Sequence, residues 1–178
     1  MMNICMKKYA CLALLVCGGM TFQAGAANST DVTFRMSVPN PTCNINITGI
    51  NNGTMSLGEL KYNSTDVPHS SFTIKGDCGG YVGTSPNYIN ASLVQGGELQ
   101  DNVRVAVKMD SNPVDKTAGP FLKFKANNAD VHMGLSDKFC QSRNGNIQCA
   151  VTPYTTVLPG APSGNGSVVI RFTVNYQA

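Results

Sequence analysis

The sequence predicts an all-β protein, folded as an antiparallel β-sandwich. Short segments with apolar residues at every second position recur along the chain, and turn residues separate them about every eight to twelve positions. No convincing stretch has the 3.6-residue apolar period of an amphipathic helix. Regularly spaced strands without helical periodicity favour two antiparallel sheets packed face to face.

The alternation is clearest in the last segment, Ser167–Tyr176. Its period of two is that of a half-buried strand, with Val168, Ile170, Phe172, Val174 and Tyr176 on the apolar face. Only Gln177 and Ala178 follow, so no later element can cover this strand. An apolar strand at the end of a chain is either an exposed sheet edge or an edge reserved for a strand of another chain.

The first 26 residues have the features of a secretory signal peptide. Lys7 and Lys8 precede an apolar run from Tyr9 to Phe22, and the small residues 24–26 suit a signal peptidase. We therefore expect an exported protein without stable membrane insertion, because the apolar run is too short to span a bilayer comfortably. Removal of this segment leaves 152 residues with 11 basic and 10 acidic side chains. This length suits one domain, and the charge balance does not suggest nucleic-acid binding.

A second alternating segment, Asp31–Val38, lies near the start of the mature chain, with Val32, Phe34, Met36 and Val38 on its apolar face. Pro39 and Pro41 follow it, and proline lacks the amide donor that a sheet ladder needs. We expect the segment to be an arm that is uncoupled from the strand beginning at Cys43. The alternative is a first strand paired within its own sheet.

The body of the chain contains further strand candidates between glycine, proline and asparagine residues. They are 43–48, 55–57, 71–75, 90–94, 103–109, 121–125 and a pair around Phe139 and 149–156.

Four cysteines remain after removal of the signal peptide, and in an oxidising compartment an even number predicts two disulfides. The dipeptide Asn144-Gly145 is a signal for a two-residue hairpin. Counting outward from it places Cys140 opposite Cys149, as a non-hydrogen-bonded pair with a Cα separation of roughly 4.5 Å. The pair Cys43–Cys78 follows by elimination.

Several of these features together resemble the pilin family, the subunits of chaperone–usher pili. The resemblance lies in the arm before the first cysteine, in Pro41-Thr42-Cys43, in the stretch Phe72–Cys78, and in a glycine followed by an alternating terminal strand with a near-terminal tyrosine. Members of that family have an incomplete immunoglobulin-like β-sandwich that lacks its seventh strand, with a disulfide joining the first two strands. The open groove is filled first by a strand of a periplasmic chaperone and then by the N-terminal donor arm of the next subunit.

The resemblance implies a signal peptide over 1–26, a donor-strand extension over 27–42 and a pilin domain over 43–178. It implies donor side chains at Val32, Phe34, Met36 and Val38. It also implies an acceptor groove that contacts the chaperone and is formed by Gly164, Val168, Ile170, Phe172, Val174 and Tyr176. Two positions depart from the family pattern: Met36 stands where the arm usually carries glycine, and Tyr176 is third from the end rather than penultimate.

The implied function is that of a structural subunit of a fimbria that supports adhesion. Its partners would be a periplasmic chaperone, an outer-membrane usher and neighbouring subunits, and it would pass through the periplasm to the surface of a Gram-negative cell. The alternative is a secreted, complete immunoglobulin-like domain or adhesin that recognises a host or carbohydrate ligand through its loops. No phosphate loop, nucleophile elbow or metal-ligand spacing occurs, so no enzyme, cofactor or metal site is predicted.

Overall fold

The computed structural model describes residues 33, 35, 43–78, 85–110, 112–134, 136–143 and 145–175. The chain divides into two units, Met1–Val38 and Pro39–Ala178. In the first unit only Thr33 and Arg35 are described, and both are exposed. The predicted signal peptide, the four predicted donor side chains and Tyr176 lie outside the described residues.

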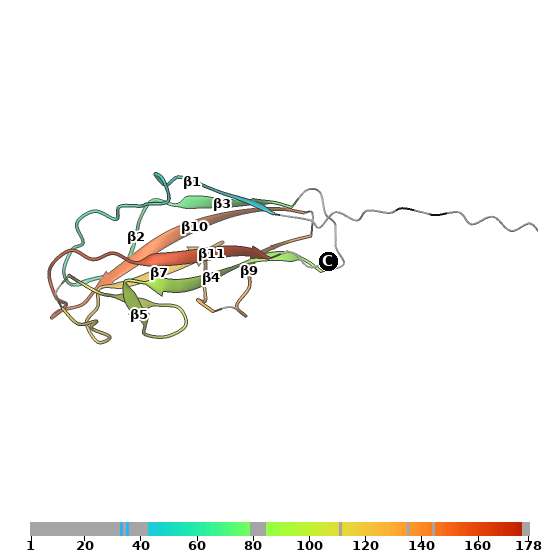
Figure 1. Cartoon of the computed structure of the whole chain (residues 1–178). Coiled ribbons are helices and arrows are strands. Elements are labelled where there is room, and N and C mark those ends of the chain that lie inside the picture. The colour runs from blue at the N-terminus through green and yellow to red at the C-terminus, as the bar shows by residue number, and fades with distance from the viewer. Residues whose placement is uncertain are drawn as a thin grey trace, which may run out of the picture. The chain divides into compact units, whose positions relative to one another are not determined.

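The second unit is an antiparallel β-sandwich, as predicted, and no helix occurs among its described residues (Figure 1). The larger sheet has the order β1 (Asn44–Thr48), β3 (Phe72–Asp77), β10 (Asn146–Val157), β7 (Phe121–Ala126), β6 (Val105–Val107) and β5 (Gly97–Leu99). In addition, β2 (Ser64–Pro68) pairs with β10 and β8 (Ala129–Asp130) pairs with β7. The smaller sheet has the order β11 (Val169–Asn175), β4 (Asn87–Gln95) and β9 (Phe139–Ser142).

The main apolar core lies between the two sheets. In β3, Phe72 and Ile74 are buried in it, whereas Lys75 on the opposite face is exposed, as the period of two requires. Phe172 of the smaller sheet packs edge to face on Phe72, with ring centroids 5.6 Å apart, and on Phe124, at 5.9 Å. Aromatic contacts of this geometry add to the stabilisation from area burial, so β11 is part of the core packing.

The chain passes from the smaller sheet to the larger one at Gly96, between β4 and β5. Gly96 has φ = +87°, and a Cβ atom there would lie 2.0 Å from the backbone oxygen of Ser167, so only glycine fits. The backbone N–H of Lys108 donates to the carbonyl of Gly96 at 2.9 Å, and that of Asp110 donates to the carbonyl of Asn165 at 2.8 Å. Backbone hydrogen bonds therefore tie the start of β11 to the larger sheet.

The prediction of a hairpin at Asn144-Gly145 is wrong. Residues 146–151 of β10 pair with β3, and β9 pairs with β4 in the other sheet. The Cys140–Cys149 disulfide is present, but it joins the two sheets, with Cα atoms 5.8 Å apart. The physical reason is that β4 offers an edge to β9 there, and the Phe139 ring packs 6.4 Å from that of Phe172, inside the sandwich.

Other predicted strands differ from the observed ones mainly where segments are short. Residues 55–57 are irregular, although Met55 and Leu57 still pack against the core. The strands β2, β5 and β8 were not predicted, because they have two to five residues each and little apolar alternation. The remaining candidates of the body correspond to β1, β3, β4, β6, β7, β9 and β10.

Candidate functional site: an open groove between β1 and β11

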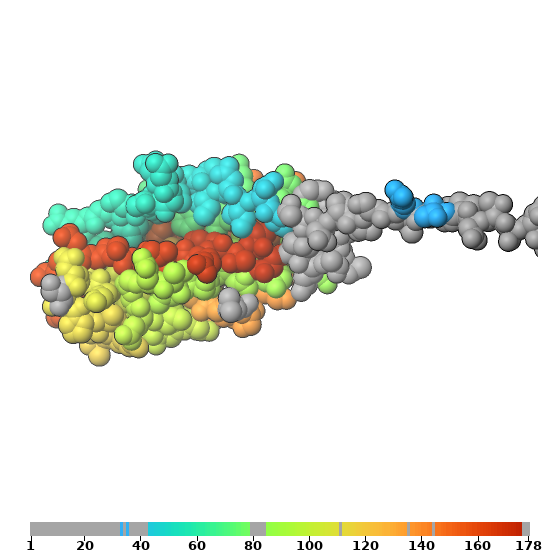
Figure 2. All heavy atoms as spheres, in the orientation of Figure 1, coloured from blue at the N-terminus to red at the C-terminus, as the bar shows by residue number. Residues whose placement is uncertain are grey.

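Each sheet ends in two strands that pair on one side only, β1 and β5 in the larger sheet and β11 and β9 in the smaller one, and the candidate site lies between β1 and β11. Among the described strands, β1 pairs only with β3, and β11 pairs only with β4. Alternate residues of such strands direct backbone N–H and C=O groups to the free edge. Figure 2 shows the surface hollowed between the cyan to teal segment, which contains β1 and the residues after it, and the red β11. We call this hollow the open groove.

The β11 wall carries apolar side chains that reach the core but are not fully covered. Ile170, Phe172 and Val174 pack against the core yet remain partly exposed. Ile89 and Ala91, which face the core from the neighbouring β4, are both 0% exposed. The difference within one sheet indicates that the core lacks a covering layer along β11. The predicted alternation is present, since the intervening residues Val169, Arg171 and Thr173 are exposed.

The opposite wall, β1, was not predicted as part of the site. Ile47 packs against the core but is partly exposed, and Ile45, on the same face of the strand, is 46% exposed. The polar residues Asn44 and Asn46 alternate with them. This isoleucine alternation is visible in the sequence and is the signal that could have identified the second wall.

The two walls approach the same part of β3 at one end of the groove. Across the larger sheet, Ile45 of β1 pairs with Gly76 of β3, which pairs with Ile147 of β10. A Cβ atom on Gly76 would lie 3.1 and 3.2 Å from the two methyl carbons of Val174. The valine of β11 therefore occupies the space that this glycine leaves, and the missing side chain sets how closely β11 approaches the larger sheet.

The other predicted site residues lie around these walls. Val168 directly precedes β11 and packs against the core. Gly164 lies in the loop before it, exposed and with φ = +130°, next to the Asp110 carboxylate, so it is not part of the strand wall. The Cys43–Cys78 disulfide, whose members are 35 positions apart, attaches the start of β1 to the end of β3.

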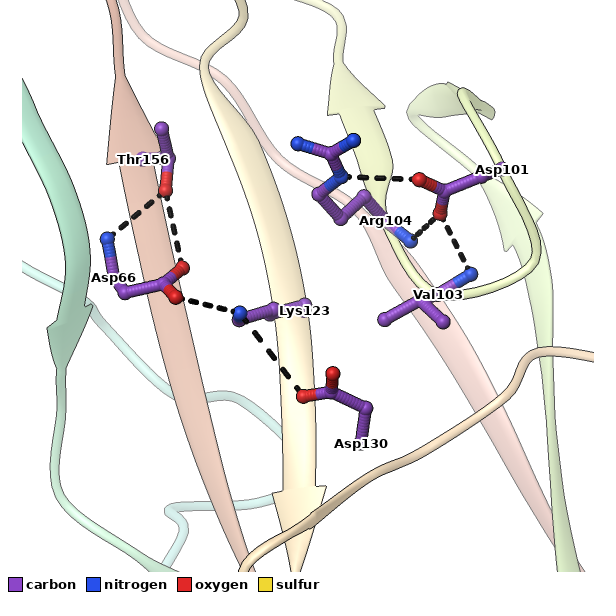
Figure 3. A network of polar contacts seen from close by, with 7 residues as sticks. All are labelled: Asp66, Asp101, Val103, Arg104, Lys123, Asp130 and Thr156. Carbon is purple, nitrogen blue, oxygen red and sulfur yellow. Dashed lines mark hydrogen bonds and ion pairs between the residues drawn. The ribbon is translucent and has the colours of Figure 1, made fainter.

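Two carboxylates with a lowered pKa, Asp66 and Asp101, belong to the polar contacts drawn in Figure 3. On the outer face of the larger sheet, the Asp66 carboxylate accepts a hydrogen bond from Lys123 Nζ at 2.7 Å, and Lys123 Nζ also lies 4.0 Å from Asp130. The Lys123 hydrogen bond is the largest of the causes that lower the pKa of Asp66. The core-facing residues of the two groove walls, by contrast, are apolar: Ile45, Ile47, Ile170, Phe172 and Val174.

The second of these two carboxylates, that of Asp101, accepts hydrogen bonds from residues of the loop before β6 (Figure 3). Partial burial opposes ionisation of Asp101, but the backbone N–H groups of Arg104 and Val103 donate to it at 2.7 and 2.8 Å, and the pKa of Asp101 is lowered overall. Its other carboxylate oxygen accepts from Arg104 Nε at 3.1 Å. These contacts shape the turn before β6.

Within the described part of the chain, no group of three or more histidine, cysteine, aspartate or glutamate side chains could hold a metal ion. The two histidines of this part of the chain are hydrogen-bonded to polar side chains. His69 Nε2 lies 2.8 Å from the hydroxyl of Thr155, and Asn102 Nδ2 donates to His132 Nδ1 at 2.8 Å. No helix among those residues is long and apolar enough to cross a membrane.

Comparisons with known proteins give a structural similarity. No protein-family model and no curated protein matches the chain. The solved structures that resemble it include "Crystal structure of the P pilus rod subunit PapA", with 16% sequence identity, a TM-score of 0.47, and coverage of 83% of this chain and 100% of that one. A likeness of this size establishes neither a family nor a function, so the function has to be inferred from the groove itself.

Proposed function

We propose that this protein is a structural subunit of a cell-surface pilus that polymerises by donor-strand exchange and so supports adhesion. The observation that carries the proposal is the open groove: two uncovered strand edges that flank core side chains left partly exposed. An extended segment laid between β1 and β11 gains backbone hydrogen bonds along a strand edge and covers those side chains.

The donor is the N-terminal arm of a second copy. Residues 31–38 alternate between apolar and polar side chains, with the period that an inserted strand needs. Four buried donor side chains contribute on the order of 6–12 kcal/mol before ordering costs, at about 1.5–3 kcal/mol each. This amount is sufficient for a long-lived joint between subunits.

The donor arm lies at the N-terminal end of the chain, and the acceptor groove is formed largely by β11 near its C-terminal end. Contacts between copies therefore join two different surfaces and are heterologous. Such contacts produce open filaments rather than closed dimers. Before assembly, the same groove exposes apolar surface that would promote aggregation. We therefore assign it two successive occupants: a strand of a periplasmic chaperone, which delivers the subunit to an outer-membrane usher, and then the arm of the next subunit in the extracellular fibre.

The test compares two substitutions on opposite faces of the arm. Phe34→Asp places a charge in the neighbour's apolar groove, whereas Thr33→Asp directs it to the other face of the inserted strand. We expect the purified mature chain and its Thr33→Asp variant to form SDS-resistant oligomers that dissociate on heating, and the Phe34→Asp variant to form none.

A synthetic peptide of residues 27–42 provides the control. Because Phe34→Asp leaves the groove intact, this variant should bind the wild-type peptide one to one, whereas Phe172→Asp, which places a charge in the β11 wall, should not. Equal assembly of Phe34→Asp and Thr33→Asp would exclude the arm as a donor. It would favour a complete binding domain that acts through its loops.

A further inference from the structure

The Cys140–Cys149 disulfide connects the two sheets along the part of the groove where β11 ends. Cys149 lies on β10 in the larger sheet and is 1% exposed, and Cys140 lies on β9 in the smaller sheet. The two cysteines are nine positions apart in sequence, yet the bond crosses the sandwich because β9 pairs with β4. The bond therefore limits the distance between the sheets.

A row of paired residues runs from this disulfide to the groove wall. In the smaller sheet, Val174 of β11 pairs with Ile89 of β4, and Ile89 pairs with Phe139 of β9. Phe139 directly precedes Cys140, and its ring centroid lies 6.4 Å from that of Phe172 in β11. A displacement of β9 would consequently reach β11 both through backbone pairing and through the aromatic contact.

The strand that carries Cys140 is short and its pairing is irregular. β9 has four residues, and its pairing with β4 contains a register shift between Asn87 and Ile89. Cys140 itself has φ = +48°. Residues other than glycine rarely adopt this backbone conformation, and it persists only where the surrounding structure stabilises it. The disulfide provides such support.

The two ends of β11 are connected to the larger sheet by different means. At its start, the loop before the strand forms an isolated bridge between Met109 and Gly166, and the backbone N–H of Asp110 donates to the carbonyl of Asn165 at 2.8 Å. Toward its end, the disulfide links β9 of the smaller sheet to β10 of the larger one. The hydrogen bond from the Cys78 backbone N–H to the carbonyl of Gly145, at 3.2 Å, continues the pairing of β3 with β10 within the larger sheet.

We infer that the Cys140–Cys149 disulfide positions the β11 wall: it holds β9, and through β4 also β11, at the distance from β1 that an inserted strand requires. This inference rests on the proposed function of the groove. Without the bond, the smaller sheet separates from the larger one at the Val174 end, and an inserted strand cannot pair with both edges. The start of β11 keeps its hydrogen-bonded connection.

The position of the wall is tested by hydrogen–deuterium exchange on the full mature chain. In the double variant Cys140→Ala/Cys149→Ala we expect amide exchange to accelerate by about tenfold or more over the second half of β11 and the paired part of β4, with little change around Met109. The control is Val157→Ala, which perturbs a separate apolar cluster with Ala118 and Ala161 and should not produce this local pattern.

Two outcomes of this exchange experiment would overturn the inference: acceleration confined to β9 and β10, or the same profile in the control variant. If the double variant does not accumulate, the wild-type chain is compared before and after partial reduction, with each reduced cysteine located by alkylation and mass spectrometry.

Binding of the 27–42 peptide separates this inference from the proposed function. We expect the double variant to release the peptide about tenfold faster than the wild-type chain. Equal release by both would overturn the positioning role. Failure of the wild-type chain to bind the peptide would instead contradict the proposed function, and the exchange profile would still decide whether the disulfide holds β11.

Discussion

The contact between Gly76 and Val174 allows the packing of the β11 wall to be tested by substitution. In Gly76→Ala, the new Cβ would lie 3.1 and 3.2 Å from the two valine methyl carbons and 3.7 Å from Ile147 Cβ. Favourable carbon contacts lie at roughly 3.5–4.0 Å, so the valine has to move by several tenths of an ångström. Overpacking of this kind typically costs about 1–3 kcal/mol.

The sign of the change in the free energy of unfolding is informative, because alanine is usually more stable than glycine within a strand. Gly76 is not among the residues with positive φ, and replacing glycine within a strand usually stabilises by about 0.5–1 kcal/mol. We therefore expect a net destabilisation of roughly 0.5–2 kcal/mol from the overpacking. Val174→Ala alone should also destabilise the protein, because it removes two methyl groups that pack on the core.

The double variant Gly76→Ala/Val174→Ala completes the cycle, because it removes the two methyl groups that the new Cβ would meet. Free energies of unfolding from urea titrations, measured on the chain with the 27–42 peptide bound, should show a favourable coupling of about 1 kcal/mol or more. Additivity within about 0.3–0.5 kcal/mol would refute the direct contact between β11 and β3.

Three further changes have definite expected outcomes. Gly96→Ala should lower the free energy of unfolding from urea titration by at least about 2 kcal/mol, because its Cβ would lie 2.0 Å from the Ser167 backbone oxygen at a positive φ. The pKa of Asp66 is lowered from 3.8, so its ion pair stabilises the protein above pH 3.8, and this stabilisation is lost as the pH falls through the folded-state pKa. Thermal melts from about pH 6 to about pH 2 should therefore show a smaller acid-induced loss of stability for Asp66→Asn than for the wild type. Cys43→Ala should reduce periplasmic yield, measured by immunoblot, more than Cys140→Ala does, because the longer loop restrains the unfolded chain more, by roughly 4 against roughly 3 kcal/mol.

The strands that were predictable from the sequence are those whose side chains alternate over several residues. The period of two in β11 reflects its position over the core, and Ile170, Phe172 and Val174 reach the core as that period requires. The alternation of β11 could therefore be read from the sequence. The role of this strand in an acceptor groove remains a prediction.

What could not be predicted depends on contacts between distant segments. A glycine after asparagine favours a tight turn locally, but the free edge of β4 and the packing of Phe139 on Phe172 place β9 in the other sheet. Likewise, the sequence around Gly76 does not reveal that Val174, almost one hundred positions later, occupies the space above it. The second wall of the groove was missed because the two isoleucines of β1 form a short pattern beside a cysteine.

The central claim, that the arm of one copy occupies the groove of another, is tested most directly by photo-crosslinking. A benzophenone side chain is incorporated at position 34 or, as the control for the opposite face, at position 33, and chains of natural isotope content are assembled with 15N-labelled chains. The account predicts crosslinks from position 34 to β1 or β11 of a differently labelled copy, and far fewer from position 33. Crosslinks from position 34 only within the same copy, or equal crosslinking to the groove from both positions, would contradict it.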